Sequence, residues 1–186
     1  MSKLRINIKK YLNLRTVLLT LILLAISLIW GKYLVGIILV IFFAPISFLT
    51  VRYSKMIPHV SAESNTAMAC YMGYVFGPAV GFFYGLAVGG FSYVMNSFVS
   101  ITYLSTVLLA GIAAVITGIL HAAGMGFTQA FILGIIIRTI IAWPWFTFVG
   151  ISPFESFTHQ SSQMFFNIII YLPLLSVVHG LILHLL

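Results

Sequence analysis

The chain has 186 residues, of which 62% are hydrophobic and only 6% are charged, and its mean hydropathy is +1.17. Soluble domains carry about 25% charged residues, so this composition indicates an integral membrane protein and argues against a nucleic-acid-binding protein. A single cysteine excludes an internal disulfide, and two glutamates without any aspartate argue against magnesium-dependent phosphoryl transfer, which needs clustered carboxylates.

We predict an all-α, polytopic protein of the cell membrane, formed by one integral membrane domain over residues 1–186. A transmembrane helix needs about 20 apolar residues. The six predicted spans are 16–30, 34–51, 67–95, 102–120, 128–149 and 164–186. The third is too long for one upright crossing, so we expect it either to tilt or to break near Gly77-Pro78, where proline removes a backbone donor. A break would allow a count of seven.

Basic residues flanking the spans predict their orientation. The Lys and Arg residues within 1–15 precede the first span, and Arg52 and Lys55 follow the second, so both segments are predicted to be cytoplasmic. With six spans, the C-terminus is cytoplasmic as well. The outward connections are then Gly31-Lys32, residues 96–101 and a longer loop over 150–163.

Five glycines recur at four-residue intervals in the third predicted span. Positions four apart lie on nearly the same face of a helix, and a row of glycines lets a second helix approach closely, which favours association in lipid. A matching row of small residues lies in the fourth span, so the two rows either pack on each other or bind a partner subunit. The residues are Gly73, Gly77, Gly81, Gly85 and Gly89 in the third span and Ala110, Ala114 and Gly118 in the fourth.

Arg138 lies near the middle of the fifth predicted span. A central arginine costs about 2.5–3.5 kcal/mol on insertion scales, so it needs a cavity or a partner. Two roles remain open: a structural arginine bound to backbone carbonyls, or a ligand for an anionic or carbonyl-bearing solute. Of the two carboxylates, Glu63 is expected on the cytoplasmic side and Glu155 on the outer loop.

Other polar and aromatic residues are candidates for the same cavity. Trp143 and Trp145 flank Pro144, which is expected to break the helical hydrogen-bond ladder, and form either an interfacial belt or a stacking platform for a planar ligand. The outer loop after them is either a solvated connection or a lid over the cavity. The remaining candidates are Glu155, His159, Asn167, Asn96 and Tyr103. The alternative for the two asparagines is that their side-chain amides form interhelical hydrogen bonds.

No nucleophile–base pair, metal-ligand set or nucleotide-binding motif is recognisable in the sequence. We therefore predict no enzymatic activity, no metal and no cofactor. Any ATP-driven step would have to be performed by another chain.

Residues 69–85 read ACYMGYVFGPAVGFFYG, with the pattern Gly-Pro-x-x-Gly-x-x-x-Gly, and residues 109–114 read LAGIAA. With its size and six predicted spans, the chain resembles the substrate-binding (S) components of energy-coupling-factor (ECF) transporters. The resemblance implies a subunit that binds a vitamin-like micronutrient at the outer side of the membrane. It would topple in the bilayer to deliver this solute inward, together with a membrane coupling subunit and cytoplasmic ATPases.

By the same implication, the solute lies among the last three spans, and the residues to suspect are Trp143, Trp145, Glu155, His159 and Asn167, with Arg138 deeper. The Ala-x-x-x-Ala coupling pattern that this family often shows in its first span is absent here. The alternative is a structural membrane scaffold that resembles the rod-shape-determining family and packs on partners through the glycine row.

Overall fold

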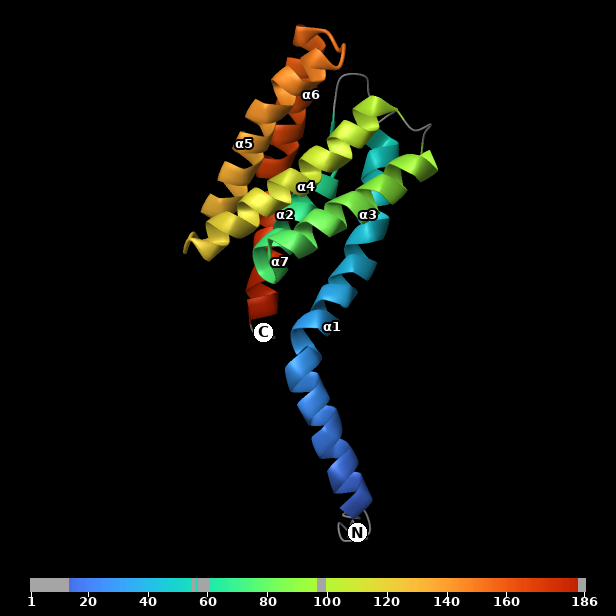
Figure 1. Ribbon diagram of the computed structural model, residues 1–186, viewed down its shortest axis with the longest axis vertical. Coiled ribbons are helices and arrows are strands. Elements are labelled where there is room, and N and C mark those ends of the chain that lie inside the picture. Colours follow the sequence, from blue (N-terminus) through green and yellow to red (C-terminus); the bar gives the residue numbers. More distant parts are fainter. Residues whose placement is uncertain (1–13, 55, 57–60, 97–99, 184–186) are drawn as a thin grey trace, which may run out of the picture.

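The computed structural model describes residues 14–54, 56, 61–96 and 100–183, with side chains from residue 31 onward, and these residues form helices and turns but no strand (Figure 1). The prediction of an all-α fold is confirmed for them. The basic segment 1–13, Lys55, residues 97–99 and the last three residues of the sixth predicted span lie outside the described residues. The helices are α1 (Leu14–Ser54), α2 (Asn65–Phe76), α3 (Pro78–Asn96), α4 (Ile101–Ala122), α5 (Phe127–Phe148), α6 (Pro153–Phe166), the π-helix η2 (Asn167–Tyr171) and α7 (Leu172–Leu183).

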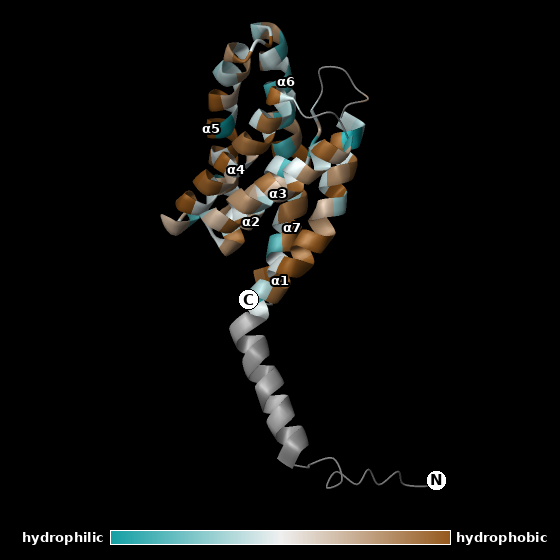
Figure 2. Cartoon of the chain, turned by 45° about the vertical axis from the view of Figure 1, so that its right-hand side comes forward, coloured by the Kyte–Doolittle hydropathy of each residue, from teal (hydrophilic) through white to brown (hydrophobic). Residues whose placement is uncertain are grey.

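Several of these helices are long and apolar enough to cross a membrane, in agreement with a multi-pass membrane protein. Many of their large hydrophobic side chains are exposed, as expected where the surroundings are lipid. In Figure 2 hydrophobic residues, coloured brown, recur along all the described helices. Within the described part of the chain there are five such stretches, Gly31–Ser54, Pro78–Asn96, Ile101–Ala122, Phe127–Phe148 and Pro153–Leu183, the last of which combines α6, η2 and α7.

α1 is one continuous helix, whereas the sequence predicted two spans joined by a turn at Gly31-Lys32. A glycine inside a helix costs only about 1 kcal/mol relative to alanine, and lysine is a good helix former. Gly31 and Lys32 have apolar residues on both sides, and they therefore do not interrupt the helix. Pro45 is also accommodated within α1.

The third predicted span consists of two helices. Of the two alternatives, one tilted helix or a break near Gly77-Pro78, the structure therefore shows the break. α2 ends at Phe76 and α3 begins at Pro78. Between them, Gly77 has a φ of 106°, a conformation that favours glycine. Pro78 fits the first turn of α3, where its missing N–H leaves no hydrogen bond unmade.

Residues 153–163 form a helix, and the prediction of an outer loop there was wrong. The side chain of Ser152 accepts a hydrogen bond of 3.2 Å from the backbone N–H of Glu155, and Pro153 occupies the first turn of α6. Only residues 150–152 connect α5 to α6. α5 itself continues through Pro144 to Phe148, so the expected interruption at Pro144 does not end the helix.

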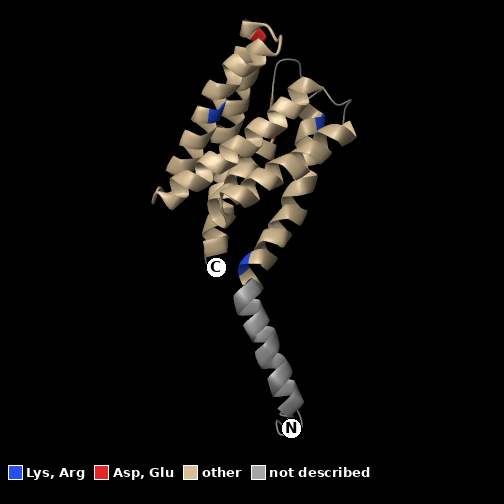
Figure 3. Ribbon diagram, in the orientation of Figure 1, with Lys and Arg blue, Asp and Glu red and all other residues tan. Residues whose placement is uncertain are grey.

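The chain runs back and forth between two ends of one bundle (Figure 1). At the upper end lie the ends of α1, α3 and α5 and the beginnings of α4 and α6. At the lower end lie the α2–α3 and α4–α5 turns and the end of α7. Arg52 is in the last turn of α1 and Glu155 in the first turn of α6, so both belong to the upper end (Figure 3).

This differs from the prediction that Arg52 and Glu155 lie on opposite sides of the membrane. The prediction counted residues 67–95 as one crossing. Because α2 and α3 are separate helices that run in opposite directions, the chain after α3 has returned to the end at which α2 began.

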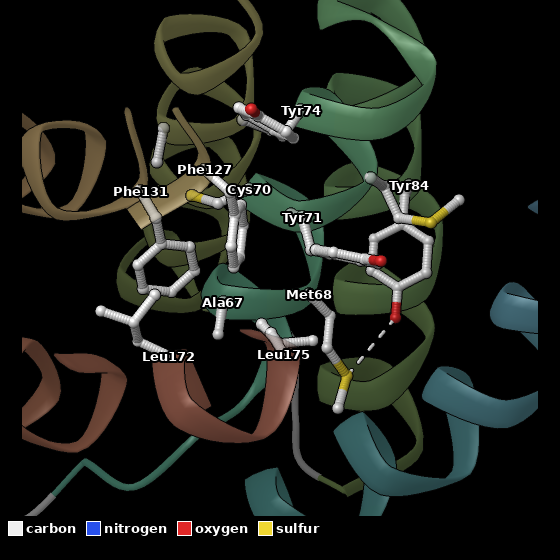
Figure 4. Close-up of a cluster of buried hydrophobic side chains, with 14 of the residues drawn as sticks. Ala67, Met68, Cys70, Tyr71, Tyr74, Tyr84, Phe127, Phe131, Leu172 and Leu175 are labelled. Atoms are coloured by element: carbon white, nitrogen blue, oxygen red, sulfur yellow. Dashed lines mark hydrogen bonds between the residues drawn. The ribbon is translucent and has the colours of Figure 1, made fainter. Parts of the chain in front are cut away.

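α2 lies at the centre of the bundle, and its residues from Asn65 to Tyr74 are all buried. A helix that is mainly apolar around its whole circumference is expected in such a position. Figure 4 shows Met68 and Tyr71 of α2 among side chains of the surrounding helices, including Phe131 of α5 and Leu175 of α7. This core holds α2 in place below the polar residues described next.

The small-residue rows contribute to packing inside the chain. A Cβ atom on Gly73 would lie 2.3 Å from the carbonyl oxygen of Ala114, and one on Gly81 would lie 2.5 Å from the Cα of Gly73. Gly77, by contrast, has no such neighbour within 4 Å and forms the break. The other members of the two rows also lie at close contacts or in the core: Gly85 against Gly111, Gly89 against Asn65, Gly118 against Gly73 and Pro78, and Ala110 fully buried.

Candidate functional site

Polar side chains occupy the buried face of α6 and η2. Ser156, Gln160, Gln163 and Asn167 follow one another at intervals of four, three and four residues, which is the spacing of one helix face, and each is only 1% exposed. Burying such groups costs free energy unless they find hydrogen-bond partners. These four residues therefore form a polar stripe that faces the inside of the bundle, where side chains of other segments provide hydrogen-bond partners.

Arg138 of α5 meets this stripe. It shares the buried face of α5 with Ile135 and Ala142 and is itself 1% exposed. Its Nη1 donates a hydrogen bond to Oε1 of Gln160. Its Nε and Nη2 atoms are buried and have no hydrogen-bond partner among the described residues, so these residues use only part of the hydrogen-bonding capacity of the guanidinium.

Glu63, just before α2, lies on the other side of the stripe and is 1% exposed. Its carboxylate accepts hydrogen bonds from Nε2 of Gln163 and from the hydroxyl of Tyr93. It also interacts electrostatically with Arg138. The sequence analysis did not expect this carboxylate to be enclosed within the bundle.

Two hydrogen-bond acceptors beside these residues also lack a partner in the described part of the chain. They are Oε1 of Gln163 and Oδ1 of Asn167, both buried, although the Asn167 amide donates to the Gln163 carbonyl at 2.6 Å. An unsatisfied buried group costs about 1–3 kcal/mol, and such groups call for an explanation when they gather in one place. We refer to the residues linked here as the polar cluster: Glu63, Thr66, Tyr93, Arg138, Gln160, Gln163 and Asn167.

Two of the predicted solute-binding residues, Arg138 and Asn167, lie in the polar cluster. Tyr103 of α4 lies at its edge, where its ring stacks on Tyr93 with a centroid separation of 5.0 Å and an interplanar angle of 24°. Asn96 has a different position. Its Nδ2 donates to the carbonyl of Phe48 at 3.2 Å and so joins α3 to α1.

The two tryptophans lie at the bundle surface. Trp143 is 46% and Trp145 42% exposed. Nε1 of Trp143 donates to the carbonyl of Pro153 at 3.3 Å, and Nε1 of Trp145 donates to Oγ of Ser105 at 3.0 Å. Both indole N–H groups are thus engaged with the protein near the upper end, an arrangement typical of an interfacial aromatic belt.

Glu155 and His159 lie on α6 rather than on a loop. Glu155 is exposed in the first turn, where the partial positive charge of the helix N-terminus favours a carboxylate. His159 is half-buried one turn later, next to Gln160 in the chain. The structure therefore does not bring Glu155 into the polar cluster.

The sequence analysis missed Glu63, Gln160, Gln163 and Tyr93 as candidates. A signal was present for the two glutamines. Ser152-Pro153 is a helix-start signature, and the polar spacing that follows it fits one helix face. Glu63 and Tyr93 carry no comparable local signal, because only the fold brings them to α6.

The sequence matches no known protein-family model, and comparisons with curated proteins and with solved structures find no significant match. Among the described residues, no group of three or more His, Cys, Asp and Glu side chains is placed to hold a metal ion. The polar cluster combines hydrogen-bonding groups with the opposite charges of Arg138 and Glu63.

Proposed function

We propose that the chain is the substrate-binding subunit of an ECF-type transporter. It binds a small, vitamin-like solute in the polar cluster and delivers it inward with a membrane coupling subunit and cytoplasmic ATPases. The observation that carries this proposal is the buried guanidinium of Arg138, whose Nε and Nη2 have no partner among the described residues. The same holds for the amide oxygens of Gln163 and Asn167 in the neighbouring polar stripe. Isolated structural arginines in membrane helices normally have their donors satisfied.

The chemistry of these atoms defines the solute. The unpaired N–H groups of Arg138 suit a carboxylate, phosphate or carbonyl oxygen, which accept hydrogen bonds. The amide oxygens of Gln163 and Asn167 suit hydroxyl, amine or ring N–H donors. A small solute with an anionic or carbonyl group at one end and donors at the other would satisfy both sets.

The resemblance to S components also includes a six-pass topology, and we propose one with different crossings from those expected from sequence. α2 has 12 residues and is about 18 Å long, and it would cross within the bundle rather than in contact with lipid. The lower end, where α7 ends, would be cytoplasmic, and the polar cluster would open toward the outer side. The six crossings are residues 31–54 of α1, then α2, α3, α4, α5 and the combined helix of α6, η2 and α7.

Mass spectrometry of small molecules extracted from the purified protein tests the proposal. We expect a co-purified solute with the unmodified chain and its loss in the Arg138→Met and Gln160→Leu variants. Glu155→Gln is the matched control, because Glu155 is exposed on the same helix as Gln160 and lies outside the polar cluster. A variant that folds and retains as much solute without Arg138 would contradict the proposal, and so would unmodified protein with no bound molecule.

The alternative, a structural scaffold that resembles the rod-shape-determining family, would use the glycine row to bind partners. Gly73, Gly81 and Gly85 lie against the backbones of neighbouring helices of the same chain. Because these glycines already pack within the chain, little of the glycine row is accessible for contact with another protein. The packing therefore supports the transporter proposal over the scaffold.

A further inference from the structure

An apolar groove lies on the lipid-facing side of the bundle, away from the polar cluster. It runs between α1 and the junction of α2 with α3 and encloses about 630 Å³, a volume within the range of small-molecule sites. Its walls are almost entirely apolar, with one charged side chain. The residues that define the groove's ends and floor are Lys32, Gly36 and Ile37 of α1, Met72 and Phe76 of α2, and Val80 of α3.

The absence of a side chain at Gly36 shapes the groove. A Cβ atom on Gly36 would lie 3.4 Å from the ring of Phe76, so the glycine allows this ring to lie directly against α1. A second hollow of about 410 Å³ adjoins the groove, since both are lined by Val40, Met72 and Val80, and it continues along α3.

The two hollows together form an extended apolar track. From Lys32 to Val40 the track follows about 12 Å of α1, and from Val80 to Val88 it follows about 12 Å of α3. A track of this shape fits a flexible hydrocarbon chain better than a compact solute. Its polar lining is too sparse to orient a solute through hydrogen bonds.

Lys32 gives the track a charged end. It is exposed, and it lines the groove with the neighbouring Tyr33. Phe76 and Val80, on either side of the Gly77 break, show that this end is the lower end of the bundle. Lysine and tyrosine at the end of a membrane-spanning bundle are typical of the headgroup region.

We propose that this groove is a binding site for an anionic phospholipid, with the lipid phosphate at Lys32 and one acyl chain along the track. The charge of Lys32 complements the phosphate, and the apolar walls of the groove match the chain. A basic side chain near the membrane surface contributes about 1 kcal/mol to the binding of anionic lipid. The site is separate from the polar cluster and does not depend on the solute bound there.

Native mass spectrometry of the full chain with phosphatidylglycerol and phosphatidylcholine in equal amounts tests this site. We expect the unmodified protein to retain phosphatidylglycerol preferentially. In Lys32→Gln, we expect the ratio of bound phosphatidylglycerol to bound phosphatidylcholine to be about fivefold lower, which corresponds to about 1 kcal/mol. Arg52→Gln is the control, because Arg52 is an exposed basic residue at the other end of α1 and does not line the groove.

Ile37→Trp tests the apolar part of the groove. Ile37 is 59% exposed, so a larger side chain can be accommodated without disturbing the core. We expect this variant to retain less of both lipids. Equal lipid preference in Lys32→Gln and the unmodified protein would overturn the proposal. The proposal would also be overturned if the unmodified chain bound a second copy of itself instead of lipid, and if Ile37→Trp abolished that dimer.

Discussion

The side-chain amide of Gln163 donates a hydrogen bond to the carboxylate of Glu63, although the two residues are 100 positions apart in the chain. The same amide lies 3.1 Å from Oγ1 of Thr66. Eight residues further along the chain, at the end of η2, the hydroxyl of Tyr171 donates to the carbonyl of Ala62 at 2.5 Å. The segment that leads into the central helix α2 is therefore held by α6 and η2, and the polar cluster is a structural joint as well as a candidate binding site.

This arrangement predicts that Glu63 and Arg138 are energetically coupled. Both groups are buried and carry opposite charges that interact electrostatically. Removing one charge leaves the other without compensation, so Glu63→Gln and Arg138→Met should each lower the thermal stability of the protein in detergent. The double variant should be less destabilised than the sum of the two single variants, with a coupling of about 0.5–3 kcal/mol. Strictly additive effects in the double-mutant cycle would show that the two charges act independently.

The contact between α2 and α3 predicts different effects at two glycines of the same helix. A Cβ atom on Gly81 would lie 2.5 Å from the backbone of Gly73, whereas one on Gly90 would have no neighbour within 4 Å. Gly81→Ala should therefore lower the unfolding temperature, because α2 and α3 must move apart. Gly90→Ala should leave that temperature unchanged or raise it, since alanine favours the helix. Equal unfolding temperatures of the two variants would contradict this packing.

The beginning of α6 depends on the side chain of Ser152, which accepts the hydrogen bond from the Glu155 N–H. Loss of such a cap costs about 1 kcal/mol. We expect Ser152→Ala to lower stability by about this amount and to increase hydrogen exchange of the amides in the first turn of α6. Thr158→Ala, which removes a hydroxyl bonded to the Phe154 carbonyl within the same helix, is the control and should leave exchange of that turn unchanged.

The sequence predicts some elements well for physical reasons. α4 and α5 agree with the predicted spans 102–120 and 128–149 to within two residues, because each is a long apolar run that ends at a glycine-containing turn. α6 was missed because its polar residues resemble a loop when burial is ignored. The length of α1 was missed because a glycine and a lysine were taken as a turn, although neither ends a helix by itself.

The candidate site likewise contains residues that could be predicted from the sequence and residues that could not. Arg138 and Asn167 could be found from sequence, because a polar side chain in an apolar span stands out. Glu63 could not, since it lies before its helix in a segment that reads as a connection. Glu63 meets Gln163 only in the folded chain, where α2 is a separate central helix and α6 packs beside its beginning. The partners of the predicted residues therefore depend on tertiary structure.

The placement of Arg52 and Glu155 at one end of the bundle predicts that both face the same side of the membrane. The single native cysteine, Cys70, is buried, so a Cys70→Ala background provides a chain without reactive thiols. In that background, Arg52→Cys and Glu155→Cys should react equally with a membrane-impermeant maleimide applied to intact cells, because both positions are exposed. Ala123→Cys, exposed in the α4–α5 turn at the lower end, should react only after the membrane is opened if the lower end is cytoplasmic, and before it if the orientation is reversed. Labelling of Arg52→Cys and Glu155→Cys from opposite sides would contradict the return of the chain through α2 and α3, whichever end faces the cytoplasm.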